Sequence, residues 1–116
     1  MTFHRASGPI LKQPRIISAA IRKSAHGQAC TMRSAWCNND PATVVFCHLP
    51  IRRFGFGGMG MKVPDIFGYY GCHQCHAHEA DVGWDDLLRA LCETQMRMIS
   101  LGLITVQDRQ NVDRRI

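Results

Sequence analysis

The sequence lacks any apolar run approaching the roughly 20 residues that a transmembrane helix needs. Its opening residues, Met1-Thr2-Phe3-His4-Arg5, are not a charged segment followed by an apolar block and a small-residue cleavage site. No secretory signal is therefore predicted. We expect a cytoplasmic protein that does not associate with membranes.

Acidic residues are almost missing from the first half of the chain. Residues 1–64 hold one acid, Asp40, against nine Lys and Arg, which gives a charge of +8; residues 65–116 hold eight acids against five Arg, which gives −3, and the two add to the overall +5. Eleven of the 14 cations are Arg, whose planar guanidinium suits bidentate contact with phosphate. This asymmetry favours a polyanionic partner held against the second half, although a merely solvated basic surface would have the same charge.

The chain is also too short for a large core. A chain of 116 residues forms one domain and buries about 65% of its accessible surface on folding, so a metal ion that joins two loops would add needed stability. We predict a mobile N-terminal arm at residues 1–14, the folded domain at residues 15–106, and a polar C-terminal tail at residues 107–116.

Potential metal ligands are concentrated in one stretch, residues 71–81. It contains Cys72-x-x-Cys75, three histidines and two carboxylates, and a second cysteine pair, Cys30 and Cys37, lies upstream. Two short-spaced pairs about 35 residues apart can form a tetrahedral four-sulfur zinc site. Three disulfides are the alternative, and a redox Cys-x-x-Cys is disfavoured because no βαβ pattern surrounds it.

Hydrophobic patterns predict an α+β protein with few elements. Residues 15–25 favour a short helix, residues 28–33 a short strand, residues 43–49 the best strand, and residues 84–103 one long helix. At 100° per residue the long helix has one apolar stripe, made of Trp84, Leu87, Leu88, Leu91, Cys92, Met98 and Ile99. An i, i+4 ion pair is expected between Glu93 and Arg97. Cys47 and Cys92, which lie outside the two cysteine pairs, are interpreted as small buried hydrophobes.

The order of these parts matches that of a known nuclease architecture. A strand ends in His48, a glycine-rich segment follows at residues 53–62, and Asp65 precedes the Cys-x-x-Cys-His run. The glycine-rich segment matches neither the P-loop nor the dinucleotide fingerprint. The layout is that of a ββα-metal, or His-Asn-His, nuclease, in which a histidine at a strand end polarises water and a facing helix holds Mg²⁺ against the phosphate. A lone histidine on an apolar strand is otherwise most often a satisfied core residue.

A closer resemblance rests on the run from Gly58 to His76, Gly-Met-Gly-Met-Lys-Val-Pro-Asp-Ile-Phe-Gly-Tyr-Tyr-Gly-Cys-His-Gln-Cys-His, with Phe46-Cys47-His48-Leu49 and the upstream cysteine pair. These motifs resemble the YbcO family of small prophage-encoded proteins regarded as nucleases, similar to the phage recombination-enhancement nuclease Ref. The likeness spans about residues 23–103.

The resemblance implies a zinc-stapled ββα-metal domain with assigned roles. His48 would be the general base, the four paired cysteines would bind structural zinc, and His76 would bind the catalytic metal. Asp65 takes roughly the place of the middle Asn, so it would orient His48 or touch the metal. The family pattern differs at Cys47 and Ala80, where other members tend to carry metal ligands, and the residues that could substitute are His78, Glu79 and Asp81.

We therefore expect a metal-dependent DNA endonuclease that uses structural Zn²⁺ and catalytic Mg²⁺ or a similar cation. It would act in phage or prophage recombination or DNA processing, with a recombination protein as a further partner. Arg52, Arg53 and Lys62, around the glycine-rich segment, would contact the DNA backbone. The alternative is a catalytically silent zinc module that only binds nucleic acid.

Overall fold

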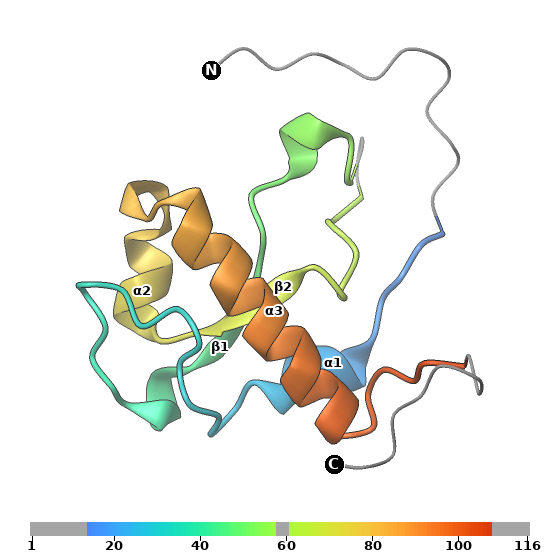
Figure 1. Cartoon of the computed structure of the whole chain (residues 1–116), viewed down its shortest axis with the longest axis horizontal. Helices are drawn as coiled ribbons and strands as arrows, with labels where there is room; N and C mark the ends of the chain where they lie inside the picture. Colours follow the sequence, from blue (N-terminus) through green and yellow to red (C-terminus); the bar gives the residue numbers. More distant parts are fainter. Residues whose placement is uncertain (1–13, 58–60, 108–116) are drawn as a thin grey trace.

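A two-stranded antiparallel sheet lies at the centre of the computed structural model, which describes residues 14–57 and 61–107 (Figure 1). Strand β1, Val45–His48, pairs with β2, Gly68–Gly71, so that His48 lies opposite Gly68. The helices of the described part are α1 (Ala19–Ser24), α2 (His73–Ala77) and α3 (Trp84–Ser100), with short 3₁₀ helices at Pro41–Thr43, Arg52–Phe54 and Glu79–Asp81.

Helix α1 is shorter than the predicted helix at residues 15–25. Ser18 caps its N-terminus by accepting a hydrogen bond from the N–H of Ile21, so the helix begins at Ala19. The preceding residues are extended because they bond across the molecule: the carbonyl of Ile16 accepts from the N–H of Asp65, and the Ser18 N–H donates to the Asp65 carboxylate. Tertiary hydrogen bonds thus override the local helical pattern.

The predicted strand at residues 28–33 is wrong, because this segment has no regular structure. Its backbone is bound by side chains and by one strand group instead. Arg89 donates to the carbonyls of Thr31 and Met32, and the Thr31 N–H donates to the carbonyl of Tyr70. These bonds hold the segment where Cys30 reaches the second cysteine pair.

Helix α3 crosses the sheet and packs mainly against β2 (Figure 1). It ends at Ser100 rather than Leu103, and Gly102 adopts a positive φ of 75° just beyond it, a common way to end a helix. Its buried residues are Leu87, Ala90, Thr94 and Met98. The predicted stripe is therefore rotated: Leu88 and Ile99 are exposed, and the buried Thr94 instead bonds to the Tyr70 N–H and to Thr31.

Two further predictions about α3 are wrong. Cys92 is exposed, whereas Cys47 is buried as predicted. Glu93 does not pair with Arg97 but accepts hydrogen bonds from Arg33 and Arg89. Arg33 reaches Glu93 from the cysteine-bearing segment, so the acid ties that segment to α3.

The predicted α+β class is confirmed, with a short N-terminal helix, a two-stranded sheet, a long C-terminal helix and four cysteines placed together. Tyr69 and Tyr70 of β2 are fully buried and form the centre of the core. The proposed arm and tail lie, apart from Pro14 and Gln107, outside the described residues, as do residues 58–60. Within the described part no helix is long and apolar enough to span a bilayer.

Candidate metal centre and histidine–carboxylate site

The two predicted cysteine pairs meet in space. The sulfurs of Cys30, Cys37, Cys72 and Cys75 all lie within 4.8 Å of one another, and those of Cys37 and Cys72 are 3.9 Å apart. Four sulfurs bound tetrahedrally at about 2.3 Å from a zinc ion would lie about 3.8 Å apart. All six cysteines are free thiols, so the three-disulfide alternative is wrong. The donor set fits a structural zinc ion.

Hydrogen bonds prepare these sulfurs to bind a cation. The N–H of Cys72 points at the sulfur of Cys30 and the N–H of Cys75 at the sulfur of Cys72, at 3.3 and 3.4 Å, while the Ser34 hydroxyl lies 3.0 Å from the sulfur of Cys75. Burial raises the pKa of the Cys72 thiol, but N–H groups of Asn38 and Cys75 outweigh it and lower this pKa to about 7. Burial raises the pKa of Cys75 to about 12, so this thiol ionises only when a cation replaces its proton.

His48 and Asp65 form a pair at the opposite end of the sheet. The Nε2 atom of His48 lies 2.7 Å from Oδ1 of Asp65; the Asp65 side chain is fully buried and the His48 side chain is 25% exposed. Phe46 packs edge-on against the imidazole, with ring centroids 5.2 Å apart. Gly68 permits this packing, because a Cβ atom there would collide with the Phe46 ring.

Asp65 is held ionised by donors from the N-terminal segment. Its Oδ2 accepts from the Ser18 N–H at 2.7 Å and from Nε of Arg22 at 2.9 Å. Burial opposes ionisation, but the bonds from Ser18, His48 and Arg22 outweigh it and keep the pKa of Asp65 below its usual range. Because the carboxylate is ionised and cannot donate, Nε2 of His48 must carry the hydrogen of their bond.

The structure does not bring His76, His78, Glu79 and Asp81 together as one cluster. His78 stacks on Trp36 and lies 3.5 Å from Asp81, whereas Glu79 accepts a hydrogen bond from Tyr69 and His76 is exposed on α2. Among the described residues, the four cysteines are the one group of three or more His, Cys, Asp or Glu able to hold a metal.

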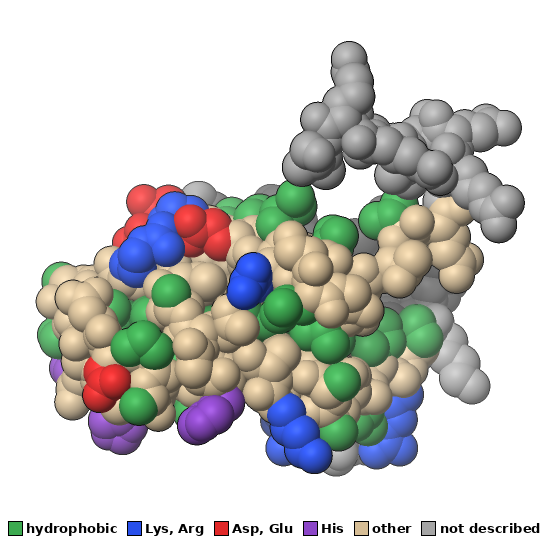
Figure 2. All heavy atoms as spheres, turned by 90° about the horizontal axis from the view of Figure 1, so that it is seen from below, with side chains coloured by type: hydrophobic (Ala, Val, Ile, Leu, Met, Phe, Trp, Pro, Cys, Tyr) green, Lys and Arg blue, Asp and Glu red, His purple; other side chains and the backbone are tan. Residues whose placement is uncertain are grey.

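Strand register explains why these residues lie apart from His48. Val45 is opposite Gly71, which directly precedes Cys72 of the four-cysteine cluster, whereas His48 is opposite Gly68. His48 and α2 thus stand at opposite ends of the strand pair. Figure 2 shows histidine side chains close together at the lower edge of one face, whereas Lys and Arg side chains are spread over several places on that face.

The predicted DNA-contacting residues flank the described ends of the glycine-rich segment. Arg52 donates to the carbonyl of Met61, so it links the two sides of this segment. The guanidinium of Arg53 lies over the rings of Phe54 and Trp84, at 4.9 and 5.6 Å from their centroids. Lys62 is exposed and lines a cavity together with Arg22.

Arg22 and Ser18 were not predicted from the sequence as parts of the His48 site. Arg22 lies 43 positions before Asp65, on a helix whose pattern indicated only a packing role. The one signal in the sequence for such a partner was the position of Asp65, which is the first acid after a long stretch whose charged residues are all basic. A buried carboxylate needs a cationic or hydrogen-bonding partner, but the sequence does not say which of the many arginines supplies it.

The sheet, the four-cysteine cluster, which could hold a metal ion, and the His48–Asp65 pair define a small α+β protein with a histidine–carboxylate pair near its surface. The chain belongs to the YbcO family, whose model, described as "Putative nuclease YbcO", matches residues 19–100. This confirms the resemblance seen in the sequence. One similar solved structure is described as a "putative bacteriophage protein" from Escherichia coli str. K-12 substr. MG1655. It is 27% identical with a TM-score of 0.54, and the match covers 72% of this chain and 100% of that chain. No match was found among curated proteins.

Proposed function

We propose that this protein is a metal-dependent endonuclease that hydrolyses phosphodiester bonds in DNA, in phage or prophage recombination or DNA processing. Membership of a family described as nucleases supports the reaction class. The observation that carries the proposal is the 2.7 Å contact between His48 and a buried, ionised Asp65. An ionised carboxylate behind a partly exposed imidazole is the arrangement that makes histidine an effective general base.

The chemistry follows from the tautomer. Asp65 accepts the Nε2 hydrogen of His48, which leaves Nδ1 as the unprotonated nitrogen that can take a proton from water. The resulting hydroxide attacks phosphorus, the bond from phosphorus to the departing sugar oxygen breaks, and that oxygen takes a proton from water. The imidazolium that forms is stabilised by the Asp65 carboxylate. Asp65 is thus a positioning residue, and Arg22 and Ser18 keep its charge and orientation fixed.

A divalent cation such as Mg²⁺ would stabilise charge on the departing oxygen when bound. The described residues offer no second cluster of three ligands, so a complete protein-built Mg²⁺ site beside His48 does not fit this structure. Mg²⁺ often keeps several waters and binds only one or two carboxylates together with substrate phosphates. The lack of a three-ligand cluster therefore does not contradict the predicted Mg²⁺ requirement, which the cleavage assay tests. The roles of His76, His78, Glu79 and Asp81 as its ligands stay predictions.

The test is cleavage of plasmid and single-stranded DNA by zinc-loaded protein with and without Mg²⁺. We expect cleavage only with the cation, and His48→Ala should lower its rate by roughly 10²–10⁴-fold while zinc content and DNA affinity stay nearly unchanged. His73→Ala, which removes an exposed histidine of α2, is the matched control and should cleave normally. If His48→Ala lowers the melting temperature but spares the activity of the folded fraction, His48 is only a core residue.

A second variant separates proton transfer from metal binding. His76→Ala should also abolish cleavage if His76 holds the catalytic metal, and higher Mg²⁺ or Mn²⁺ should then restore part of the activity. Added metal should not rescue His48→Ala, because the missing group is a proton acceptor.

The silent zinc module is the second candidate, and the absence of another ligand cluster among the described residues favours it. Such a protein would bind DNA through its basic half and need only the four-cysteine centre. DNA binding without cleavage under every divalent cation, by protein with full zinc content, would establish this alternative.

A further inference from the structure

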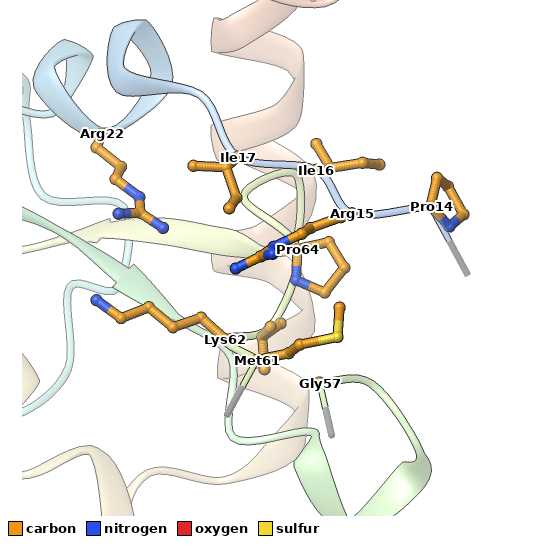
Figure 3. Close-up of a pocket in the computed structure, with 10 residues that line it drawn as sticks. Pro14, Arg15, Ile16, Ile17, Arg22, Gly57, Met61, Lys62 and Pro64 are labelled. Atoms are coloured by element: carbon orange, nitrogen blue, oxygen red, sulfur yellow. The ribbon is translucent and has the colours of Figure 1, made fainter. Parts of the chain in front are cut away.

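A cationic recess of about 230 Å³ lies beside the His48 site, and one predicted DNA-contacting residue, Lys62, lines it. The extended segment before α1 forms one wall, and Gly57 with residues 61–64, at the end of the glycine-rich segment and just beyond it, forms the other (Figure 3). Its charged residues are Arg15, Arg22 and Lys62, and Figure 3 shows their side chains extending toward the same side of the recess.

Among the described residues that line it, the recess has three cationic side chains and no carboxylate. No acid lines it, and neither Arg15 nor Lys62 forms an ion pair with any acid in the part of the chain that the structure describes. The Nε atom of Arg22 donates a hydrogen bond to Asp65, and the guanidinium makes no other hydrogen bond to the described residues. The side chain of Arg22 is 35% exposed, so its remaining N–H groups can reach a ligand. Arg22 is paired with Asp65, but Arg15 and Lys62 have no acidic partner among the described residues, so a bound anion would offset their charge.

The remaining walls suit a nucleotide backbone rather than a free ion alone. Ile16, Met61 and Pro64 supply apolar surface next to the cationic groups. A phosphodiester presents its charged oxygens beside the apolar faces of its sugars, so both kinds of surface would be matched. Arginine forks and a lysine ammonium are the usual protein partners of such oxygens.

The recess is connected to the proposed general base through one side chain. Arg22 bonds to Oδ2 of Asp65, whose Oδ1 bonds to His48. A phosphate on Arg22 would therefore lie on the far side of Asp65 from His48, so the recess suits a neighbouring phosphate better than the one that is attacked.

We propose that Arg15, Arg22 and Lys62 form a binding pocket for one backbone phosphate of the nucleic-acid strand, flanking the phosphate cleaved at His48. The position relative to cleavage rests on the proposed function, whereas phosphate binding does not. The pocket fixes the strand so that another phosphodiester faces the imidazole. Arg15 and Lys62 are binding residues, and Arg22 serves both the phosphate and Asp65.

The first test uses dimethyl phosphate, a phosphodiester without bases, in an NMR titration of zinc-loaded protein. We expect saturable shifts at the amides of Ile16, Ile17 and Val63, which line the recess. The double variant Arg15→Gln/Lys62→Gln should lose these shifts, whereas Arg97→Gln, which removes an exposed cation of α3, should keep them. Shifts that persist in the double variant would overturn the pocket assignment.

The second test uses a single-stranded DNA oligonucleotide without added divalent cation, so that binding is measured alone. The double variant should bind roughly tenfold more weakly at low salt, and the slope of log affinity against log salt should flatten by about 1, the change expected for one lost phosphate contact. Arg97→Gln should leave the slope unchanged. Unaltered oligonucleotide binding despite lost dimethyl phosphate shifts would mean a small-anion site and would also overturn the proposal.

The cleavage assay separates this inference from the proposed function. If the wild type cleaves DNA, the double variant should raise KM with a smaller effect on kcat, because its charges bind the strand and do not transfer protons. Cleavage with a wild-type KM would refute the pocket and leave the nuclease intact. Lost shifts and a flattened slope in a protein that never cleaves would support the pocket and refute the nuclease.

Discussion

Replacing Asp65 by Asn tests whether one ionised carboxylate holds the His48 site together. Three donors converge on this side chain: the Ser18 N–H at 2.7 Å, Nε of Arg22 at 2.9 Å and Nε2 of His48 at 2.7 Å. The substitution keeps size and shape but removes the charge. It also turns one acceptor atom into an NH₂ donor inside a fully buried site.

The expected loss in the free energy of unfolding follows from those contacts. One donor of the protein must then face the new NH₂ group, and a buried donor without an acceptor costs about 1–3 kcal/mol. Loss of the ion pair between Arg22 and Asp65 costs less free energy, because the Arg22 side chain is 35% exposed and solvent partly screens the pair. We expect the free energy of unfolding to fall by about 2–4 kcal/mol, a large share of the 5–15 kcal/mol typical of a small protein.

The pH dependence of this loss gives the assay its specificity. The folded pKa of Asp65 is lowered, so its ionisation stabilises the protein above the unfolded value of about 3.9, and this stabilisation is lost as pH falls through the folded pKa. Urea unfolding of zinc-loaded wild type and Asp65→Asn should therefore differ most above about pH 4 and converge in stronger acid. Zinc release in acid affects both proteins and cancels in the difference.

Activity gives a second measure of the same substitution. The amide of the Asp65→Asn variant would no longer enforce the Nε2–H tautomer of His48, so cleavage should fall by about 10²–10⁴-fold. Asp86→Asn is the control, because this partly exposed acid of α3 makes a single 3.5 Å contact with Arg89. A variant at position 65 as stable as the wild type, with the same acid dependence, would refute the role of Asp65 as an ionised centre.

The remaining predictions concern the cysteines. Metal analysis of purified reduced protein should find one zinc per chain, and Cys72→Ser should lose the metal and most of the fold, because such sites contribute on the order of 10 kcal/mol; folded wild type without zinc would contradict this. Alkylation of zinc-loaded protein at neutral pH should modify Cys92 alone, since Cys92 is exposed, burial raises the pKa of Cys47 to about 12, and zinc protects the other four thiols. Mass spectrometry after addition of a chelator should then reveal modification of those four, and early labelling of Cys47 would contradict its burial.

Local patterns predicted the parts of the fold that local chemistry determines. The strand ending at His48, the long helix starting at Trp84 and the meeting of the two cysteine pairs could all be predicted, because apolar runs, turn residues and ligand spacing are encoded nearby in the chain. The predictions failed where distant groups compete for the backbone. Residues 15–18 are extended because Asp65 bonds to them, and residues 28–33 are irregular because Arg89 binds two of their carbonyls.

The sequence likewise predicted some features of the candidate site and missed those that depend on distant contacts. His48 and Asp65 were singled out by their order in the chain, and the structure joins them. Arg22 was missed, because no local signal connects a helix near the N-terminus with an acid 43 positions later. The separation of α2 from His48 was missed for a related reason: it depends on the register in which Val45 faces Gly71, and motif spacing alone does not specify register.

Two polar centres replace the large core that this chain is too short to build. At one end of the sheet, four cysteines can tie residues 30–37 to the start of α2 through a metal ion. At the other end, Asp65 ties the N-terminal segment to His48. Zinc would therefore stabilise the fold without touching the proposed base, whereas Asp65 holds that base directly. Loss of zinc should therefore affect His48 only through loss of the fold, whereas substitution of Asp65 should alter the tautomer of His48 in protein that still binds zinc.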